Sequence, residues 1–287
     1  MRHLALIANV ERPNLRPILR KAIREIHAAG FQLTLDEPTA HLLDIHSGTI
    51  ASTHLLAKSA DLMLVFGGDG TILRVAREMA GLSTPIFGIN TGGLGFLTGS
   101  ATGQLKDSLK KIKAGKFQLE RLSMLEAFGE HQGEPFRRVA LNDMVISRGT
   151  IPRLIDVEVK INGESLTHYR CDGLIIGTPT GSTAYSLAAG GAVVTPDAEV
   201  LTLTPICPHT LSNRSVILGW DSQIELRILK HRAETFLSAD GHVQAELRIG
   251  DRLLIRRSRH FVNLARLASA SFFSTLRHKL QWRGSNL

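Results

Sequence analysis

The feature that most constrains the fold is a short apolar run, Leu62–Phe66, that stops at a glycine-rich segment, Gly67–Thr71. An uninterrupted apolar run of this length is typical of a strand that is buried on both faces, as in a parallel sheet. Apolar residues then recur at helical spacing from Ile72 to Met79, and Gly81 follows them. We therefore expect a strand, a turn that contains the glycines, and a helix.

The same alternation surrounds this unit. Apolar residues at helical spacing over Leu15–Ile26 stop before Gly30, a natural helix end. Pro85–Ile89 is another short apolar run, and the glycine-rich segment Asn90–Phe96 follows it. Alternating strands and helices of this kind predict a doubly wound α/β domain, which we place at residues 1–120.

The second half of the chain has the period of strands. Val157, Val159 and Ile161 alternate with polar residues up to the dipeptide Asn162–Gly163, which is typical of a tight hairpin. We predict a β-rich, sandwich-like and mainly antiparallel domain over residues 121–265, and a C-terminal tail, residues 266–287, that returns to the first domain.

Composition narrows the classes of protein that remain. The chain has 287 residues and a formal charge of +8, which favours anionic partners, whether phosphate-bearing small molecules or nucleic acid. Its basic residues are dispersed along the chain, so we expect no nucleic-acid stripe. No apolar run approaches the roughly 18 residues of a membrane span, and the two cysteines form no CxxC pair. We expect a cytoplasmic protein with reduced thiols.

The Gly67–Thr71 segment is the first candidate for chemistry. Glycines after a buried strand let backbone amides approach a phosphate, and the helix that follows adds a favourable dipole. The carboxylate of Asp69 would be repelled there unless it accepts a proton or meets a metal ion. The alternative is a plain reverse turn, because both residue types favour turns. No Walker sequence and no standard dinucleotide fingerprint is present.

Two polar constellations occur in the second half. Asp172–Ser186 joins an apolar strand to a turn dense in hydroxyls, which can bind sugar hydroxyls and phosphates. Ser182 does not lie in a nucleophile elbow, so hydrolase chemistry is disfavoured. Asn142 and Asp143 interrupt what we predict to be one apolar strand; they are either edge or bulge residues or ligand contacts.

Four segments together carry a family resemblance. GGDGT at 67–71, NTGGLGFL at 90–97, LND at 141–143 and DGLIIGTPTGSTAYSLAAGG at 172–191 closely resemble the NAD kinase family in their order and separation. GGDGT alone is also similar to turns of phosphofructokinases and of diacylglycerol or sphingosine kinases. The TPTGSTAYSLAAGG segment is the more specific signal, and the resemblance spans most of the chain.

The resemblance implies transfer of the γ-phosphoryl group of ATP to the 2′-hydroxyl of the adenosine ribose of NAD, giving NADP and ADP. It also implies a divalent cation, usually magnesium, for which we assign no protein ligand. Asp69 would accept the hydroxyl proton. The phosphates would lie against the backbone of the first motif, at Gly67, Gly68, Gly70 and Thr71.

The same resemblance assigns residues to NAD. Asn142 and Asp143 would bind ribose hydroxyls, Asp172 would lie near the nicotinamide, and Phe96 would stack on adenine. Asp143 stands where many relatives have Glu, and His242 where relatives often have Gln. The predicted NAD-binding set is Asp69, Gly70, Arg74, Phe96, Asn142, Asp143, Arg153, Arg170, Asp172, Thr183, Ala184, Tyr185, Ser186, Leu187, Ala188 and His242.

Arg170 resembles the Gram-negative type of the family, which tends to use ATP rather than polyphosphate. Members assemble as homodimers or homotetramers, so we expect a homo-oligomer, with NAD and ATP as partners and neither nucleic acid nor membrane. Two rivals stay open. A lipid kinase would share the GGDGT turn, and a regulatory module would bind the dinucleotide without turnover.

Overall fold

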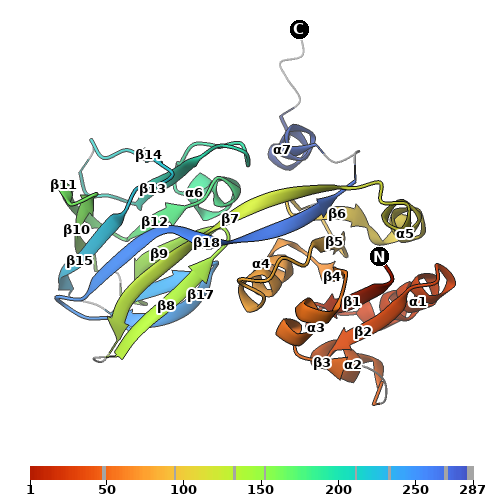
Figure 1. Cartoon of the computed structure of the whole chain (residues 1–287). Coiled ribbons are helices and arrows are strands. Elements are labelled where there is room, and N and C mark those ends of the chain that lie inside the picture. The colour runs from red at the N-terminus through yellow and green to blue at the C-terminus, as the bar shows by residue number, and fades with distance from the viewer. Residues whose placement is uncertain are drawn as a thin grey trace, which may run out of the picture. The chain divides into compact units, whose positions relative to one another are not determined.

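The computed structural model describes residues 1–46, 50–93, 95–131, 134–151, 153–210, 212–231, 234–267 and 271–282. The chain forms two compact units, which we describe separately. The first holds Met1–Arg121 and the segment that begins at Phe261, and the second holds Leu122–His260. Two long strands carry the chain from one unit to the other, β7 (Gln118–His131) and β18 (Arg252–Arg266) (Figure 1).

The first unit is built on a parallel sheet in the order β3-β2-β1-β4-β5, with β6 beside β5. Its strands are β1 (His3–Ala8), β2 (Gln32–Asp36), β3 (Ile50–Ala51), β4 (Leu62–Gly67), β5 (Ile86–Asn90) and β6 (Thr98–Ala101). The chain leaves β1 towards β2 and returns to β4 on the other side of β1. Ligands of α/β proteins bind at the carboxyl ends of strands at such a switch point, here the ends of β1 and β4.

Helices cover this sheet. They are α1 (Leu15–Ala28), α2 (Glu37–Leu43), α3 (Thr53–Ser59), α4 (Asp69–Glu78), the 3-10 turn η1 (Thr102–Gln104) and α5 (Leu105–Lys113), and a further helix, α7 (Phe272–Leu280), follows β18 in the chain. α1 packs beside α5, and α3 packs beside α4. Every residue of β4 is buried, so both faces of the sheet are covered and the predicted α/β class is confirmed. Among the described residues, no helix has the length and apolarity to cross a membrane.

The second unit is a sandwich of two antiparallel sheets. Their further strands are β8 (Glu134–Ala140), β9 (Asp143–Arg148), β10 (Ile155–Ile161), β11 (Glu164–Cys171), β12 (Gly173–Gly177), β13 (Val200–Ile206), β14 (Val216–Gly219), β15 (Ile224–His231), β16 (Thr235–Ala239) and β17 (His242–Leu247). One sheet orders β11-β10-β15-β18, with β7 beside β18 and β8 beside β7. The other orders β14-β13-β12-β9-β16-β17. Val157 and Leu226 of the first sheet share one core with Ile176 and Leu203 of the second, which confirms the β-rich prediction.

Local turn chemistry explains the hairpin between β10 and β11. Asn162 and Gly163 both have left-handed backbones, with φ of 53° and 84°. Two such residues form the tight turn whose twist matches the flanking strands. The predicted Asn-Gly hairpin is confirmed.

The turn after β4 is shorter than the sequence predicts. Gly67 is the last residue of β4, Gly68 is the extended N-cap, and α4 already begins at Asp69. An acidic residue is favoured in the first helical turn by the helix dipole, and the N–H groups of that turn have no helical acceptor. The prediction that Asp69 lies in a turn ahead of the helix is therefore wrong.

Candidate active site

The Asp69 carboxylate is held in a fixed direction at the carboxyl end of β4. Its Oδ2 accepts the N–H of Phe96 at 2.9 Å, and its Oδ1 accepts the N–H of Leu97 at 2.9 Å. Each oxygen keeps a further lone pair for another donor. Asp69 is half-buried, so this aimed carboxylate can accept a proton from a ligand hydroxyl.

Gly95 makes this arrangement possible. A Cβ on Gly95 would overlap the carboxylate of Asp69. The GGDGT and NTGGLGFL segments, which the sequence presents as separate turns, therefore form one constellation in the first unit. Leu94, within the second segment, lies outside the described residues.

Arg266, near the end of β18, supports the segment that holds Asp69. Its guanidinium donates to the carbonyl oxygen of Thr98 at 3.0 Å and to that of Phe96. It also donates to the Glu120 carboxylate at 3.0 Å. Sequence reasoning missed Arg266, because nothing local links it to a loop about 170 residues earlier in the chain.

The glycines of the first motif differ in their surroundings. A Cβ on Gly67 would collide with the Thr71 side chain, whereas a Cβ on Gly68 or Gly70 would have no neighbour within 4 Å among the described residues. The carbonyl oxygen of Gly68 accepts the N–H groups of Thr71 and Ile72 at 3.1 and 3.4 Å. The backbone around Gly68 and Gly70 is therefore open to a ligand.

Two other predicted residues of the first unit have partners inside it. Arg74 donates to both carboxylate oxygens of Glu78, at 3.0 and 3.2 Å, so its charge is compensated along α4. The Phe96 ring is half-buried, and its centroid lies 5.9 Å from that of Phe272 in α7.

The Leu141–Asp143 segment of the second unit is a break between two strands. The predicted single strand is wrong here, because β8 ends at Ala140 and β9 begins at Asp143. The Asp240 carboxylate accepts the N–H groups of Leu141, Asn142 and Asp143 at distances between 2.7 and 3.3 Å. In a continuous strand these N–H groups would donate to a neighbouring strand, whereas here they donate to the Asp240 carboxylate.

Asn142 and Asp143 are buried acceptors. Oδ1 of Asn142 has no hydrogen-bond partner among the described residues, and the Asp143 residue is 4% exposed. Burial, followed by the nearby charge of Asp240, raises the pKa of Asp143 to about 7. Buried polar groups are normally hydrogen-bonded, so this pair is suited to a ligand that donates hydrogen bonds.

Thr178 and Gly181 hold the Leu141–Asp143 segment from its other side. The Thr178 hydroxyl donates to the carbonyl oxygens of Leu141 and Asn142 at 2.7 and 3.3 Å. A Cβ on Gly181 would overlap the Asn142 backbone. The LND motif and the TPTGSTAY motif are thus packed directly on each other.

The hydroxyl-rich turn consists of η2 (Thr180–Thr183) and α6 (Tyr185–Ala188). Ser182 donates to the carbonyl oxygen of Pro179 at 2.7 Å and accepts the N–H of Val194 at 2.9 Å, so its hydroxyl serves the fold. The buried Ser186 hydroxyl contacts that of Thr204 at 3.0 Å. The outer side of the turn is formed by the more exposed residues of the predicted set, Thr183, Ala184, Tyr185, Leu187 and Ala188.

The remaining predicted residues are more solvent-accessible. Asp172 is half-buried and accepts Nε of Arg148 at 2.7 Å, a partner that the sequence did not indicate. Arg153, Arg170 and His242 are exposed. The structure gathers Asn142, Asp143 and the hydroxyl-rich turn closely, and it leaves these three at the surface of the second unit.

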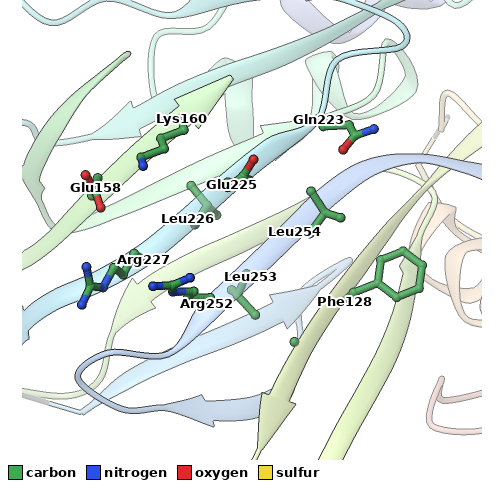
Figure 2. Close-up of a pocket in the computed structure, with 11 residues that line it drawn as sticks. Phe128, Glu158, Lys160, Gln223, Glu225, Leu226, Arg227, Arg252, Leu253 and Leu254 are labelled. Carbon is green, nitrogen blue, oxygen red and sulfur yellow. The ribbon is translucent and has the colours of Figure 1, made fainter. Parts of the chain in front are cut away.

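A hollow of about 410 Å³ lies elsewhere on the second unit, over β10, β15 and β18 (Figure 2). Phe128, Glu158, Lys160 and Arg227 are among the residues that line it. It contains none of the predicted site residues. Cavity size alone therefore does not indicate the candidate site.

Comparison with known proteins agrees with this geometry. Residues 4–117 match the family model of the ATP-NAD kinase N-terminal domain, and residues 141–267 match that of the ATP-NAD kinase C-terminal domain. An NAD kinase of Desulforamulus reducens is 37% identical over 285 residues, which covers 99% of each chain. An NAD kinase of Geobacter sulfurreducens is 38% identical over 284 residues, 98% of this chain and 99% of the relative. The chain belongs to the NAD kinase family.

Solved structures of NAD kinase relatives show the same fold. Yeast NADH kinase, crystallised with NADH, superposes with a TM-score of 0.91 at 25% identity and covers 100% of this chain and 89% of its own. An NAD kinase from Archaeoglobus fulgidus, crystallised with ATP, gives a TM-score of 0.77 at 25% identity, over 98% of this chain and 100% of its own. The two-domain fold of the NAD kinase family is therefore present here.

Proposed function

We propose that this protein transfers the γ-phosphoryl group of ATP to the 2′-hydroxyl of the adenosine ribose of NAD, giving NADP and ADP. Membership of the NAD kinase family supports this reaction. The observation that carries it is the Asp69 carboxylate, held by the Phe96 and Leu97 amides at the carboxyl end of β4.

Asp69 acts as the proton acceptor. The ribose 2′-oxygen attacks the γ-phosphorus while the bond from that phosphorus to the oxygen of the β-phosphate breaks, and ADP leaves with the bonding pair. The hydroxyl proton passes to Asp69. Because the transition state of phosphoryl transfer is loose, positioning and charge stabilisation supply most of the catalysis. The phosphates are assigned to the backbone of Gly67, Gly68, Gly70 and Thr71, which is open at Gly68 and Gly70.

A divalent cation, magnesium by family resemblance, would bind at this site through the phosphate oxygens of the substrate. The described residues contain no cluster of three or more His, Cys, Asp or Glu that could hold a metal ion. Magnesium is usually bound by one or two carboxylates together with substrate phosphates. The cation would bind the phosphates and neutralise their charge, and Asp69 stays assigned to the hydroxyl proton.

NAD contacts in the second unit follow from the buried acceptors. Ribose hydroxyls are donors that fit the buried Asp143 and Asn142 Oδ1, for which no hydrogen-bond partner occurs in the described part of the chain. We assign Asp172 to the nicotinamide end of NAD and expect the turn at Thr183–Ala188 to lie along the rest of the dinucleotide. Gly70, Arg74, Phe96, Arg153, Arg170 and His242 stay predicted contacts.

The test incubates the full chain with ATP, magnesium and NAD and measures NADP with an NADP-specific dehydrogenase. We expect NADP to form in proportion to ADP. NAD binding without NADP would favour the regulatory module, and labelled phosphatidate from diacylglycerol would favour the lipid kinase. Polyphosphate in place of ATP tests the donor preference inferred from Arg170. Sedimentation of the protein and its location in cell fractions test the proposed homo-oligomer and cytoplasmic location.

A further inference from the structure

Arg12 lies in the connection between β1 and α1, and its guanidinium rests on the second glycine-rich segment. Its Nη1 donates to the Thr91 hydroxyl at 2.9 Å. A Cβ on Gly92 would lie 2.6 Å from Nη1 and 2.8 Å from Nη2 of Arg12. Gly92 therefore leaves the space that the guanidinium occupies.

Hydrogen bonds join two segments to the end of β4: the chain just before Arg12 and the glycine-rich segment that its guanidinium contacts. The N–H of Asn9 donates to the carbonyl oxygen of Phe66 at 2.9 Å, and the N–H of Thr91 donates to that of Gly67 at 3.3 Å. The Gly92 N–H donates to the Asn90 side chain at 2.7 Å, which fixes the turn. Arg12 is thus placed at the switch-point edge of the sheet, where the GGDGT motif begins.

The charge of Arg12 is not compensated by a carboxylate among the residues that the structure describes. Three other arginines of this unit do have one: Arg16 pairs with Asp44, Arg74 with Glu78 and Arg266 with Glu120. The positive end of the α4 dipole lies at the same sheet edge, which also lacks a Walker lysine. A guanidinium in this position is suited to a phosphate, whose oxygens match its planar donors.

We propose that Arg12 binds phosphate oxygens of the ATP donor. This assignment rests on the proposed function and extends it. The NTGGLG segment then has two tasks, because Gly92 makes room for the cation that binds the donor and Gly95 makes room for the Asp69 carboxylate. The triphosphate is favoured over the NAD pyrophosphate because it carries more negative charge and because Arg12 borders the motif assigned to ATP.

The test compares Arg12→Gln with Arg16→Gln, a matched control whose arginine follows closely in the chain and has a surface partner. Loss of a charge-assisted contact predicts a KM for ATP that is about ten- to a hundred-fold higher in Arg12→Gln. The KM for NAD and the Tm stay near the wild-type values. Arg12→Lys retains the charge without the planar fork and recovers part of the loss. Arg16→Gln leaves both KM values unchanged.

Two outcomes would overturn the proposal. An increase confined to the KM for NAD would assign Arg12 to the dinucleotide, and unchanged values for both substrates would make it a structural link to Thr91.

If Arg12→Gln unfolds, Gly92→Ala is the second variant, because its methyl group displaces the guanidinium. Gly93→Ala is its control, since a Cβ there has no neighbour within 4 Å in the part of the chain that the structure describes. The same ATP-specific loss is expected in Gly92→Ala alone, and its absence there would also refute the proposal.

Calorimetric titration with magnesium-ATP separates this proposal from the proposed function. Wild-type protein that binds ATP but forms no NADP would refute the kinase reaction only. Weaker ATP binding in Arg12→Gln than in Arg16→Gln would still support the role of Arg12, and equal binding would refute it.

Discussion

The two units each present a carboxylate next to a motif of the NAD kinase family, but the surroundings of the two are opposite. Asp69 is half-buried and has an amide donor on each oxygen. Asp143 is 4% exposed and lies near Asp240, so its pKa is raised to about 7. In the second unit the backbone amides go to Asp240 instead. Backbone amides therefore fix the direction of the Asp69 carboxylate, whereas burial and the charge of Asp240 act on the protonation of Asp143.

The largest effect is expected for Asp69→Asn. The substitution removes the proton acceptor at nearly constant shape, and loss of such a group costs about 10²- to 10⁴-fold in rate. We expect kcat to fall by this factor while NAD binding, measured by calorimetry, changes little. Because the new amide group must face a backbone donor, the Tm is measured as a control. Near-normal turnover would reject Asp69 as the base.

A smaller loss is expected for Gly95→Ala, which tests whether the direction of Asp69 matters. The added methyl group overlaps the carboxylate and must turn it away from its present direction. Misplacement of a reacting group by about 1 Å can cost up to about 10²-fold in rate. We expect kcat to fall about ten- to a hundred-fold. Gly93→Ala, in the same loop with open space around it, is the control. Equal rates in both variants would show that the Asp69 direction is unimportant.

The raised pKa of Asp143 predicts a pH-dependent stability. Between the ordinary value of 3.8 and about 7, the folded state binds a proton that the unfolded state has released. The free energy of unfolding therefore falls as pH rises through this window, by an amount on the order of a few kcal/mol, and is level above it. Asp143→Asn removes this contribution. Urea unfolding of both proteins at pH 5 and pH 8 should show the wild type losing more stability. An equal loss in the two proteins would contradict the burial argument.

The smallest effect is expected for Asp240→Asn, which tests how much the charge of Asp240 contributes to the raised pKa of Asp143. It removes the charge that is the second cause of the raised Asp143 pKa, after burial. The pKa of Asp143 should fall but stay above 3.8, so the pH-dependent loss of stability still starts near 3.8, ends at a lower pH than in the wild type and is smaller. The same unfolding series measures it. A pH dependence identical to that of the wild type would show that Asp240 does not act on Asp143.

Sequence patterns predicted the parts of this molecule that depend on local chemistry. The buried strand Leu62–Phe66, the helix that carries Leu15 and Leu19, and the hairpin at Asn162–Gly163 each follow from residues close in the chain. Their periodicity and backbone preferences need no distant partner, so these three elements can be predicted without a structure.

The contacts that position the candidate site were not predictable in this way. Asp69 meets amides 27 and 28 residues later, and Asp240 meets amides 97 to 99 residues earlier. No local pattern states which distant carboxylate will hold which backbone segment. The sequence signal at Asp240 is the Asp-Gly dipeptide, which indicates a turn and does not identify the backbone N–H groups that the carboxylate accepts. The motifs thus indicate candidate residues, and the fold supplies the contacts that orient them.

The most direct test of the central claim identifies the product of the reaction. The full chain is incubated with ATP labelled in the γ-phosphoryl group, magnesium and NAD, and the product is examined by phosphorus NMR. The account predicts that the label appears as a phosphomonoester on the 2′-oxygen of the adenosine ribose, with ADP formed in equal amount. Label in inorganic phosphate alone, or on another hydroxyl of NAD, would contradict it.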